Sequence, residues 1–232
     1  MKIIAHRGVR TSATENSLPA LQAAVAEGMG VECDIRSTGS GRLVLCHDKS
    51  LRRVANLNLA VADITDADLG QIRLAGGEPL ALAETVIEQI LPQTFVNFEF
   101  KDSLSIKPLI TKLAGTSAPH GLLLSTRRTK DIRLIKGSEF TPGLIGRVGW
   151  LTLNKALRLG VNVIIIRGWW FNRFTTTLAK RFGLRVYIYG RSYQAANYAA
   201  KEVEGLIVDV VSPKDIARFG VKRDNNQPEQ TD

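Results

Sequence analysis

The sequence has 232 residues, and its hydrophobic content of 44% and charged content of 23% are ordinary for a globular protein with one large domain and a sizeable core. It contains no apolar run near the roughly 20 residues of a membrane span and no signal-peptide pattern at its start, so we expect a cytoplasmic protein. The formal net charge of +9 is spread without basic runs or nucleic-acid-binding signatures, which favours a solvated basic surface or attraction of a phosphate-bearing substrate over nucleic acid.

Short apolar runs, typical of strands, alternate with segments of helical periodicity through the first hundred residues. The turn-forming stretch Thr38 to Gly41 separates two apolar runs and indicates a hairpin. The predicted elements are strand 1–5, helix 18–26, strand 31–35, hairpin strand 43–46, short helix 68–74, helix 80–90 and strand 94–101. The hairpin strand is therefore an insertion after the second strand.

The alternation continues through the second half of the chain. The predicted elements are helix 105–114, strand 121–125, helix 129–135, strand 143–148, helix 151–159, strand 161–166, helix 175–182, strand 184–189, helix 194–201, strand 205–210 and helix 214–219. Leaving out the hairpin, eight strands alternate with helices, which predicts an α/β fold of the (β/α)₈ TIM-barrel type. We expect a single domain over 1–221 and a frayed polar tail over 222–232; a doubly wound open sheet is the alternative.

Two acidic residues stand out in the second predicted strand. Glu32 and Asp34 are two residues apart in an apolar run, so both carboxylates project to the same side of a strand. Such a pair is costly to bury, and a divalent cation bound between the carboxylates would remove that cost. The predicted hairpin returns His47 towards them. This segment predicts a metal site with a histidine beside it.

Further reactive residues end the first and third core strands. Glu99 and Lys101 repeat the two-apart pattern, and three carboxylates suit Mg²⁺ or Ca²⁺ better than Zn²⁺. In a (β/α)₈ barrel these positions and His6 meet at the carboxyl ends of the strands, where active sites lie. Two histidines can supply a general acid and a general base, and Arg7 can contact a phosphate in a bidentate manner. The set indicates cleavage of a phosphate ester.

The chain resembles the glycerophosphodiester phosphodiesterase family over nearly its whole length. The segments that carry the resemblance are IIAHRG at 3–8, ENS at 15–17, VECDIRST at 31–38, LVLCHD at 43–48, FVNFEFK at 95–101, GLLLST at 121–126, GLRVYIYG at 183–190 and VEGLIVDVVSP at 203–213. The resemblance implies a (β/α)₈ barrel, one divalent cation, and hydrolysis of small glycerophosphodiesters to glycerol 3-phosphate and an alcohol.

The resemblance also implies roles for individual residues. The matching positions are His6 and His47 for the acid/base pair, Glu32, Asp34 and Glu99 for the metal ligands, Arg7 and Lys101 for phosphate contact, and Glu15 for a site glutamate that supports the first loop. Tyr189-Gly190-Arg191 stands where the family usually has a Trp-Thr segment, which leaves the substrate preference open. The choice between Mg²⁺ and Ca²⁺, the division of roles between the histidines and the oligomeric state also stay open.

Other interpretations compete with this one. A related enzyme that acts on lysophospholipids would suit the basic charge and the pairs Trp169–Trp170 and Tyr187–Tyr189, although no amphipathic membrane anchor is evident. A noncatalytic phosphate-binding module predicts loss of a histidine or metal ligand, and none is lost. Glu15 could instead be a carboxylate that interacts favourably with the dipole of a helix at its N-terminus. Asp209 is either structural or directed into the pocket. We expect both cysteines, Cys33 and Cys46, to be reduced.

Overall fold

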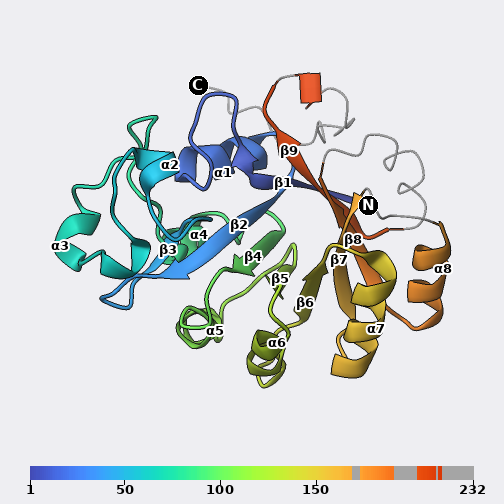
Figure 1. Cartoon of the computed structure of the whole chain (residues 1–232). Helices are drawn as coiled ribbons and strands as arrows, with labels where there is room; N and C mark the ends of the chain where they lie inside the picture. The colour runs from blue at the N-terminus through green and yellow to red at the C-terminus, as the bar shows by residue number, and fades with distance from the viewer. Residues whose placement is uncertain (169–172, 191–202, 213, 216–232) are drawn as a thin grey trace.

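A closed barrel of parallel strands forms the centre of the computed structural model, which describes residues 1–168, 173–190, 203–212 and 214–215. Within these residues eight parallel strands follow the order β1-β9-β8-β7-β6-β5-β4-β2, and pairing between β1 and β2 closes the barrel (Figure 1). The strands are β1 Lys2–Val9, β2 Gly30–Ser37, β4 Val96–Phe100, β5 Leu122–Thr126, β6 Pro142–Gly146, β7 Val163–Arg167, β8 Arg185–Tyr189 and β9 Gly205–Val210. The predicted TIM barrel is confirmed.

Helices cover the outside of the barrel and bury the outward-facing apolar side chains of the strands. They are α1 Leu18–Ala26, α4 Ala83–Gln89, α5 Ile106–Leu113, α6 Thr129–Lys136, α7 Gly149–Leu159 and α8 Arg173–Arg181. Figure 1 shows α5 to α8 side by side around the strands. Phe98 of β4, for example, is fully buried in the same cluster as Ile106 of α5 and Leu109. None of the helices in the described part of the chain has the length and apolarity needed to cross a bilayer.

The predicted hairpin after the second strand is present as part of a larger insertion. Strand β3 (Leu43–Leu45) pairs antiparallel with β2. The short elements that follow are α2 Arg52–Ala55, the 3₁₀ helix η1 Val61–Asp63 and α3 Asp66–Leu69. They have a small hydrophobic cluster of their own, which includes Val44, Leu51 and Ile64. Pairing of β3 with β2 attaches the insertion to the barrel, at the left of Figure 1.

Two predicted helices differ from the structure. The helix predicted over 68–74 is α3, which begins at Asp66 because Thr65 forms a capping box with Asp68, and ends before Gly70. The helix predicted over 80–90 begins only at Ala83, because Leu82 pairs with Val44 beside β3. Tertiary pairing therefore overrides helical periodicity in this region. The predicted helix 194–201, most of the predicted helix 214–219, the boundary at 221 and the tail 222–232 lie outside the described residues.

The inner face of the barrel sets the positions of the polar side chains. An apolar cluster fills the barrel interior nearer the amino ends of the strands. The members of this cluster are Ile4, Phe95, Leu123, Ile145, Val163, Ile165, Tyr187 and Ile207. Because side chains alternate along a strand, residues two or four positions further on point into the barrel above this cluster. At these positions lie His6 of β1 and Glu99 of β4, and the strand register pairs them with Glu32 and Asp34 of β2 on the same face. The carboxyl end of the barrel interior is therefore polar.

We predict that Gly8→Ala destabilises the fold more than Gly183→Ala. Both glycines have positive φ, +85° and +69°, but a Cβ atom at Gly8 would lie 2.5 Å from the backbone of Ala20, whereas nothing lies within 4 Å at Gly183. A left-handed alanine costs about 1 kcal/mol, and the clash adds roughly 1–3 kcal/mol at Gly8. Urea unfolding measures both losses, and equal losses would contradict the close approach of β1 to α1.

Candidate active site

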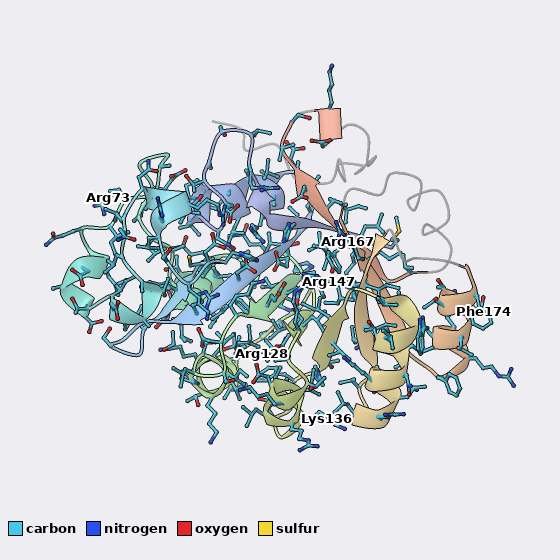
Figure 2. All side chains as sticks on the ribbon, in the orientation of Figure 1. Arg73, Arg128, Lys136, Arg147, Arg167 and Phe174 are labelled. Atoms are coloured by element: carbon cyan, nitrogen blue, oxygen red, sulfur yellow. The ribbon has the colours of Figure 1, made fainter. Side chains whose placement is uncertain are left out.

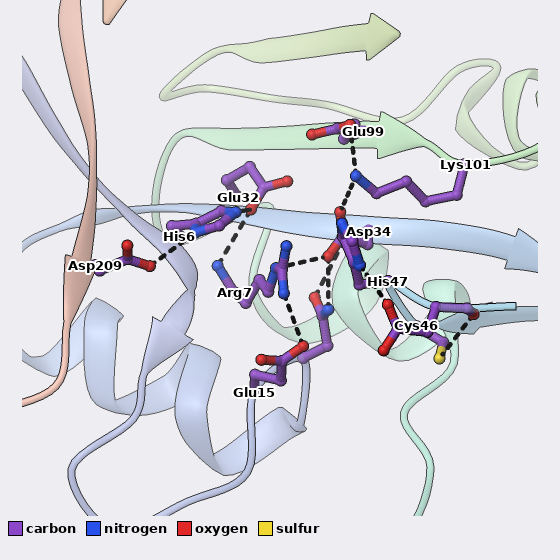
Figure 3. A network of polar contacts seen from close by, with 12 residues as sticks. His6, Arg7, Glu15, Glu32, Asp34, Cys46, His47, Glu99, Lys101 and Asp209 are labelled. Atoms are coloured by element: carbon purple, nitrogen blue, oxygen red, sulfur yellow. Dashed lines mark hydrogen bonds and ion pairs between the residues drawn. The ribbon is translucent and has the colours of Figure 1, made fainter. Parts of the chain in front are cut away.

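The carboxyl ends of β1, β2 and β4 and the adjoining loops bring the predicted site residues together (Figure 3). His6 and Arg7 come from β1, Glu32 and Asp34 from β2, and Glu99 from the carboxyl end of β4. Lys101 follows β4, Glu15 lies in the loop before α1, and His47 follows β3. The geometry therefore joins all eight residues in one polar cluster.

The three carboxylates form the buried centre of this cluster. Glu32, Asp34 and Glu99 each offer an oxygen within 4.8 Å of the others, and Asp34 and Glu99 are directly paired across β2 and β4. Oxygens that ligate a single Mg²⁺ or Ca²⁺ at about 2.0–2.6 Å lie at such separations. Within the described residues Glu32 Oε1 is buried without a hydrogen-bond partner. The donor set and this unpaired oxygen fit one divalent cation.

The protonation of Glu32 and Asp34 differs because their neighbours differ. Burial and the nearby charge of Asp34 raise the pKa of Glu32 to about 8. Burial alone would also raise the pKa of Asp34, but the charges of Lys101 and Arg7 lower it to about 2. The cluster as described therefore lacks one positive charge at Glu32, and this is the charge that a bound cation would supply.

Two basic side chains neutralise the rest of the cluster. Arg7 Nε lies 2.9 Å from Asp34 Oδ2, and Arg7 Nη1 donates to Glu15 Oε1 at 2.9 Å. Lys101 Nζ lies 2.9 Å from Asp34 Oδ1 and also donates to Glu99 Oε1. Glu15 is thus joined to the site through Arg7, rather than serving only the N-terminus of α1. Both side chains thus hold positive charge directly beside the carboxylates.

Each histidine is oriented by a carboxylate at Nδ1. His6 Nδ1 lies 2.8 Å from Asp209 Oδ1, and His6 Nε2 lies 3.8 Å from Glu32 Oε2. His47 Nδ1 lies 2.7 Å from Asp48 Oδ1. Burial alone would lower the pKa of His6, but Glu32 and Asp209 raise it above its ordinary value. With Nδ1 engaged in both rings, Nε2 is the nitrogen available for proton transfer.

The structure adds residues that the sequence interpretation missed or left open. Asp209 of β9 is directed into the barrel and orients His6. Asn16, in the left-handed region with φ of 59°, donates Nδ2 to Asp34 Oδ2 and accepts from the Asp34 backbone N–H. Arg127, after β5, places Nε 3.4 Å from Glu99 Oε1. Two-residue spacing from Ser125 could have indicated the inward direction of Arg127, but no local signal links Asn16 to Asp34.

Comparison with known proteins gives a consistent result. The model of the glycerophosphoryl diester phosphodiesterase family matches residues 6–137. A glycerophosphodiester phosphodiesterase of Bacillus altitudinis is 31% identical over 129 residues, which cover 51% of this chain and 53% of the relative. A probable glycerophosphodiester phosphodiesterase 2 of Mycobacterium tuberculosis is 28% identical over 64% of this chain and 59% of the relative. The chain thus spans somewhat over half the length of these curated relatives.

Among solved structures, the barrel is similar to that of a phosphodiesterase of Oleispira antarctica in complex with sn-glycerol-3-phosphate. The TM-score is 0.84 with 20% sequence identity, and the match covers 94% of this chain and 96% of the other. At this identity the likeness concerns the fold. It supports the barrel over most of the chain, beyond the family match at residues 6–137.

We expect Glu32→Gln to weaken binding of Mg²⁺ or Ca²⁺ at least tenfold, because an amide replaces a charged ligand. Gln has nearly the shape of the protonated carboxyl that the raised pKa of Glu32 indicates, so folding of the metal-free protein should change little. Glu84→Gln is the control, since Glu84 pairs with Lys112 on the outer surface. Isothermal titration calorimetry with each cation measures the affinity; equal effects of the two variants would contradict the site.

Proposed function

Because the chain belongs to the glycerophosphoryl diester phosphodiesterase family, we propose that it hydrolyses glycerophosphodiesters to glycerol 3-phosphate and an alcohol. The observation that carries the proposal is the buried carboxylate group flanked by two histidines, each oriented by a carboxylate at Nδ1. This arrangement supports proton transfer by the histidines and neutralisation of a phosphate by the basic residues at the barrel mouth.

Glu32, Asp34 and Glu99 would hold one divalent cation, Mg²⁺ or Ca²⁺, since every donor is an oxygen. When bound, the cation supplies Lewis acidity at a non-bridging phosphoryl oxygen and holds the phosphate in place. Arg7 and Lys101 lie beside the same carboxylates and neutralise negative charge on the phosphate as it develops. Glu15 keeps the Arg7 guanidinium in position.

His6 and His47 divide the proton transfers. One accepts a proton at Nε2 from the attacking hydroxyl, which belongs to water or to the neighbouring carbon of the glycerol. The other donates its Nε2 proton to the oxygen of the leaving alcohol. Asp209 and Asp48 accept from the Nδ1–H groups and stabilise the imidazolium that forms during transfer. Attack by the glycerol hydroxyl would give a cyclic phosphate, which water then opens.

The alternatives from the sequence receive less support. For a lysophospholipid substrate, Tyr187 and Tyr189 would have to form a surface pair. Tyr187 is buried in the barrel interior, however, and the Tyr189 hydroxyl accepts from Arg127 at 3.2 Å. Trp169 and Trp170 lie outside the described residues. A noncatalytic phosphate-binding module does not explain why both histidines are oriented by carboxylates. A cytoplasmic location stays a prediction.

The experiment that tests the proposal measures glycerol 3-phosphate released from glycerophosphocholine and from glycerophosphoethanolamine. We expect release with Mg²⁺ or Ca²⁺ and loss of release with a chelator. Release of choline from lysophosphatidylcholine, with no product from the two glycerophosphodiesters, would move the proposal to the lysophospholipid class. No release from any of the three with either cation would overturn hydrolysis by this site.

His6→Ala and His47→Ala are expected to lower kcat at least a hundredfold, because general acid–base catalysis contributes about 10²–10⁴-fold. The cation affinity should stay within a few-fold of the starting protein, because neither histidine is among the proposed ligands. His120→Ala is the control, since His120 is exposed in the connection before β5. Activity of either test variant equal to that of the control would sink the assignment of the histidines.

A further inference from the structure

The barrel mouth has two chemically different halves. The half formed by β1, β2 and β4 carries the carboxylates and histidines of the candidate active site. Across the mouth, three consecutive strands, β5, β6 and β7, each have an arginine at or directly after the carboxyl end. We call Arg127, Arg147 and Arg167 the arginine arc. Figure 2 labels Arg147 and Arg167 near the ends of β6 and β7.

The strand alternation directs the arginine arc into the mouth. Each arginine is two or four residues after a side chain of the interior apolar cluster, and these side chains are Leu123, Ile145 and Ile165. The register places Arg147 directly beside Arg167, about 4.8 Å away on the next strand, and places Arg127 two residues deeper on β5. They therefore differ from the basic residues on the outer helices, which face solvent.

Contacts of Arg127 confirm this direction for the first member. Its Nε lies 3.4 Å from Glu99 Oε1, and its Nη1 donates to the Tyr189 hydroxyl at 3.2 Å. Its guanidinium also lies 5.2 Å from the centre of the Tyr189 ring. Arg127 therefore reaches from β5 both to the carboxylate group and to β8, and it connects the arc to the candidate active site.

Arg127 and Arg147 also line one cavity of about 190 Å³. Lys155 adds a third positive charge, and the first turn of α7 completes the wall without a side-chain cap. No acidic side chain lines this cavity. The cavity is thus a concave surface of one charge sign, and Arg127, which lines it, also contacts Glu99 of the candidate active site.

The charges of Arg147 and Arg167 are balanced differently from those of the basic residues in the other half of the mouth. Arg7 and Lys101 each contact two carboxylates. In the part of the chain that the structure describes, the Arg147 and Arg167 side chains have neither an ion pair nor a hydrogen bond. Like charges on adjacent strands repel each other, and an anionic group between them would relieve this repulsion.

We propose that the arginine arc binds a second anionic group of the substrate, so that the enzyme prefers glycerophosphodiesters whose alcohol carries a carboxylate or a phosphate. This inference rests on the proposed function, because the first phosphate must occupy the carboxylate half of the mouth. The arc then receives the alcohol part of the diester, and the charge of that part determines specificity.

Two matched substrate pairs test the proposal. Glycerophosphoserine differs from glycerophosphoethanolamine by one carboxylate, and glycerophosphoinositol 4-phosphate differs from glycerophosphoinositol by one phosphate. We expect kcat/KM to be roughly tenfold higher for the anionic member of at least one pair, as charge-assisted hydrogen bonds contribute at this level. The preference should shrink at high ionic strength. The pair that responds tells which anionic group fits.

Arg147→Gln and the double variant Arg147→Gln/Arg167→Gln should remove this preference stepwise and change kcat/KM for the neutral member less than about twofold. Arg133→Gln on the outer face of α6 removes the same charge and should keep the preference. Equal kcat/KM within both pairs for the unmodified protein, or a preference kept by the double variant, overturns the proposal. No turnover of any of the four substrates overturns the proposed function, and this inference with it.

Discussion

The buried charge of Asp34 is the constraint on which the site depends. Asp34 has no solvent exposure, and an isolated carboxylate there would be protonated. Arg7 from β1, Lys101 after β4 and Asn16 before α1 each contact it, so three separate segments must be in place for the charge to exist. Closure of β1 and β4 around β2 and formation of the site are therefore the same event. The site is part of the barrel's stability as well as of its chemistry.

Much of the candidate site could be predicted because its pattern is local. The two-residue spacing of Glu32 with Asp34 places both on the inner face wherever a strand forms, and the hairpin after Thr38 returns the chain towards them. The helix predicted over 68–74 was wrong because Thr65 and Gly70 define a shorter one. Residues 80–82 do not join the helix because Leu82 pairs with Val44 of β3, and the local sequence pattern carries no signal for that pairing.

Contacts between distant segments explain what could not be predicted. Asp209 is 203 positions from His6, and only the pairing of β9 with β1 brings them together. The position of Arg127 beside Glu99 likewise requires the order of β4 and β5 in a closed sheet. The net charge of +9 left a solvated basic surface and attraction of a phosphate-bearing substrate both open, and the distribution of charge around the barrel rim emerges only from the folded barrel.

The hydrogen bond between His6 and Asp209 has a consequence for biosynthesis. The ring of His6 is made early in translation, but the carboxylate that orients it emerges from the ribosome only when synthesis has passed β9. A nascent chain that already carries the whole carboxylate group is thus still without an oriented His6. The orientation of His6 is therefore completed only when β9 pairs with β1 and the sheet closes on itself.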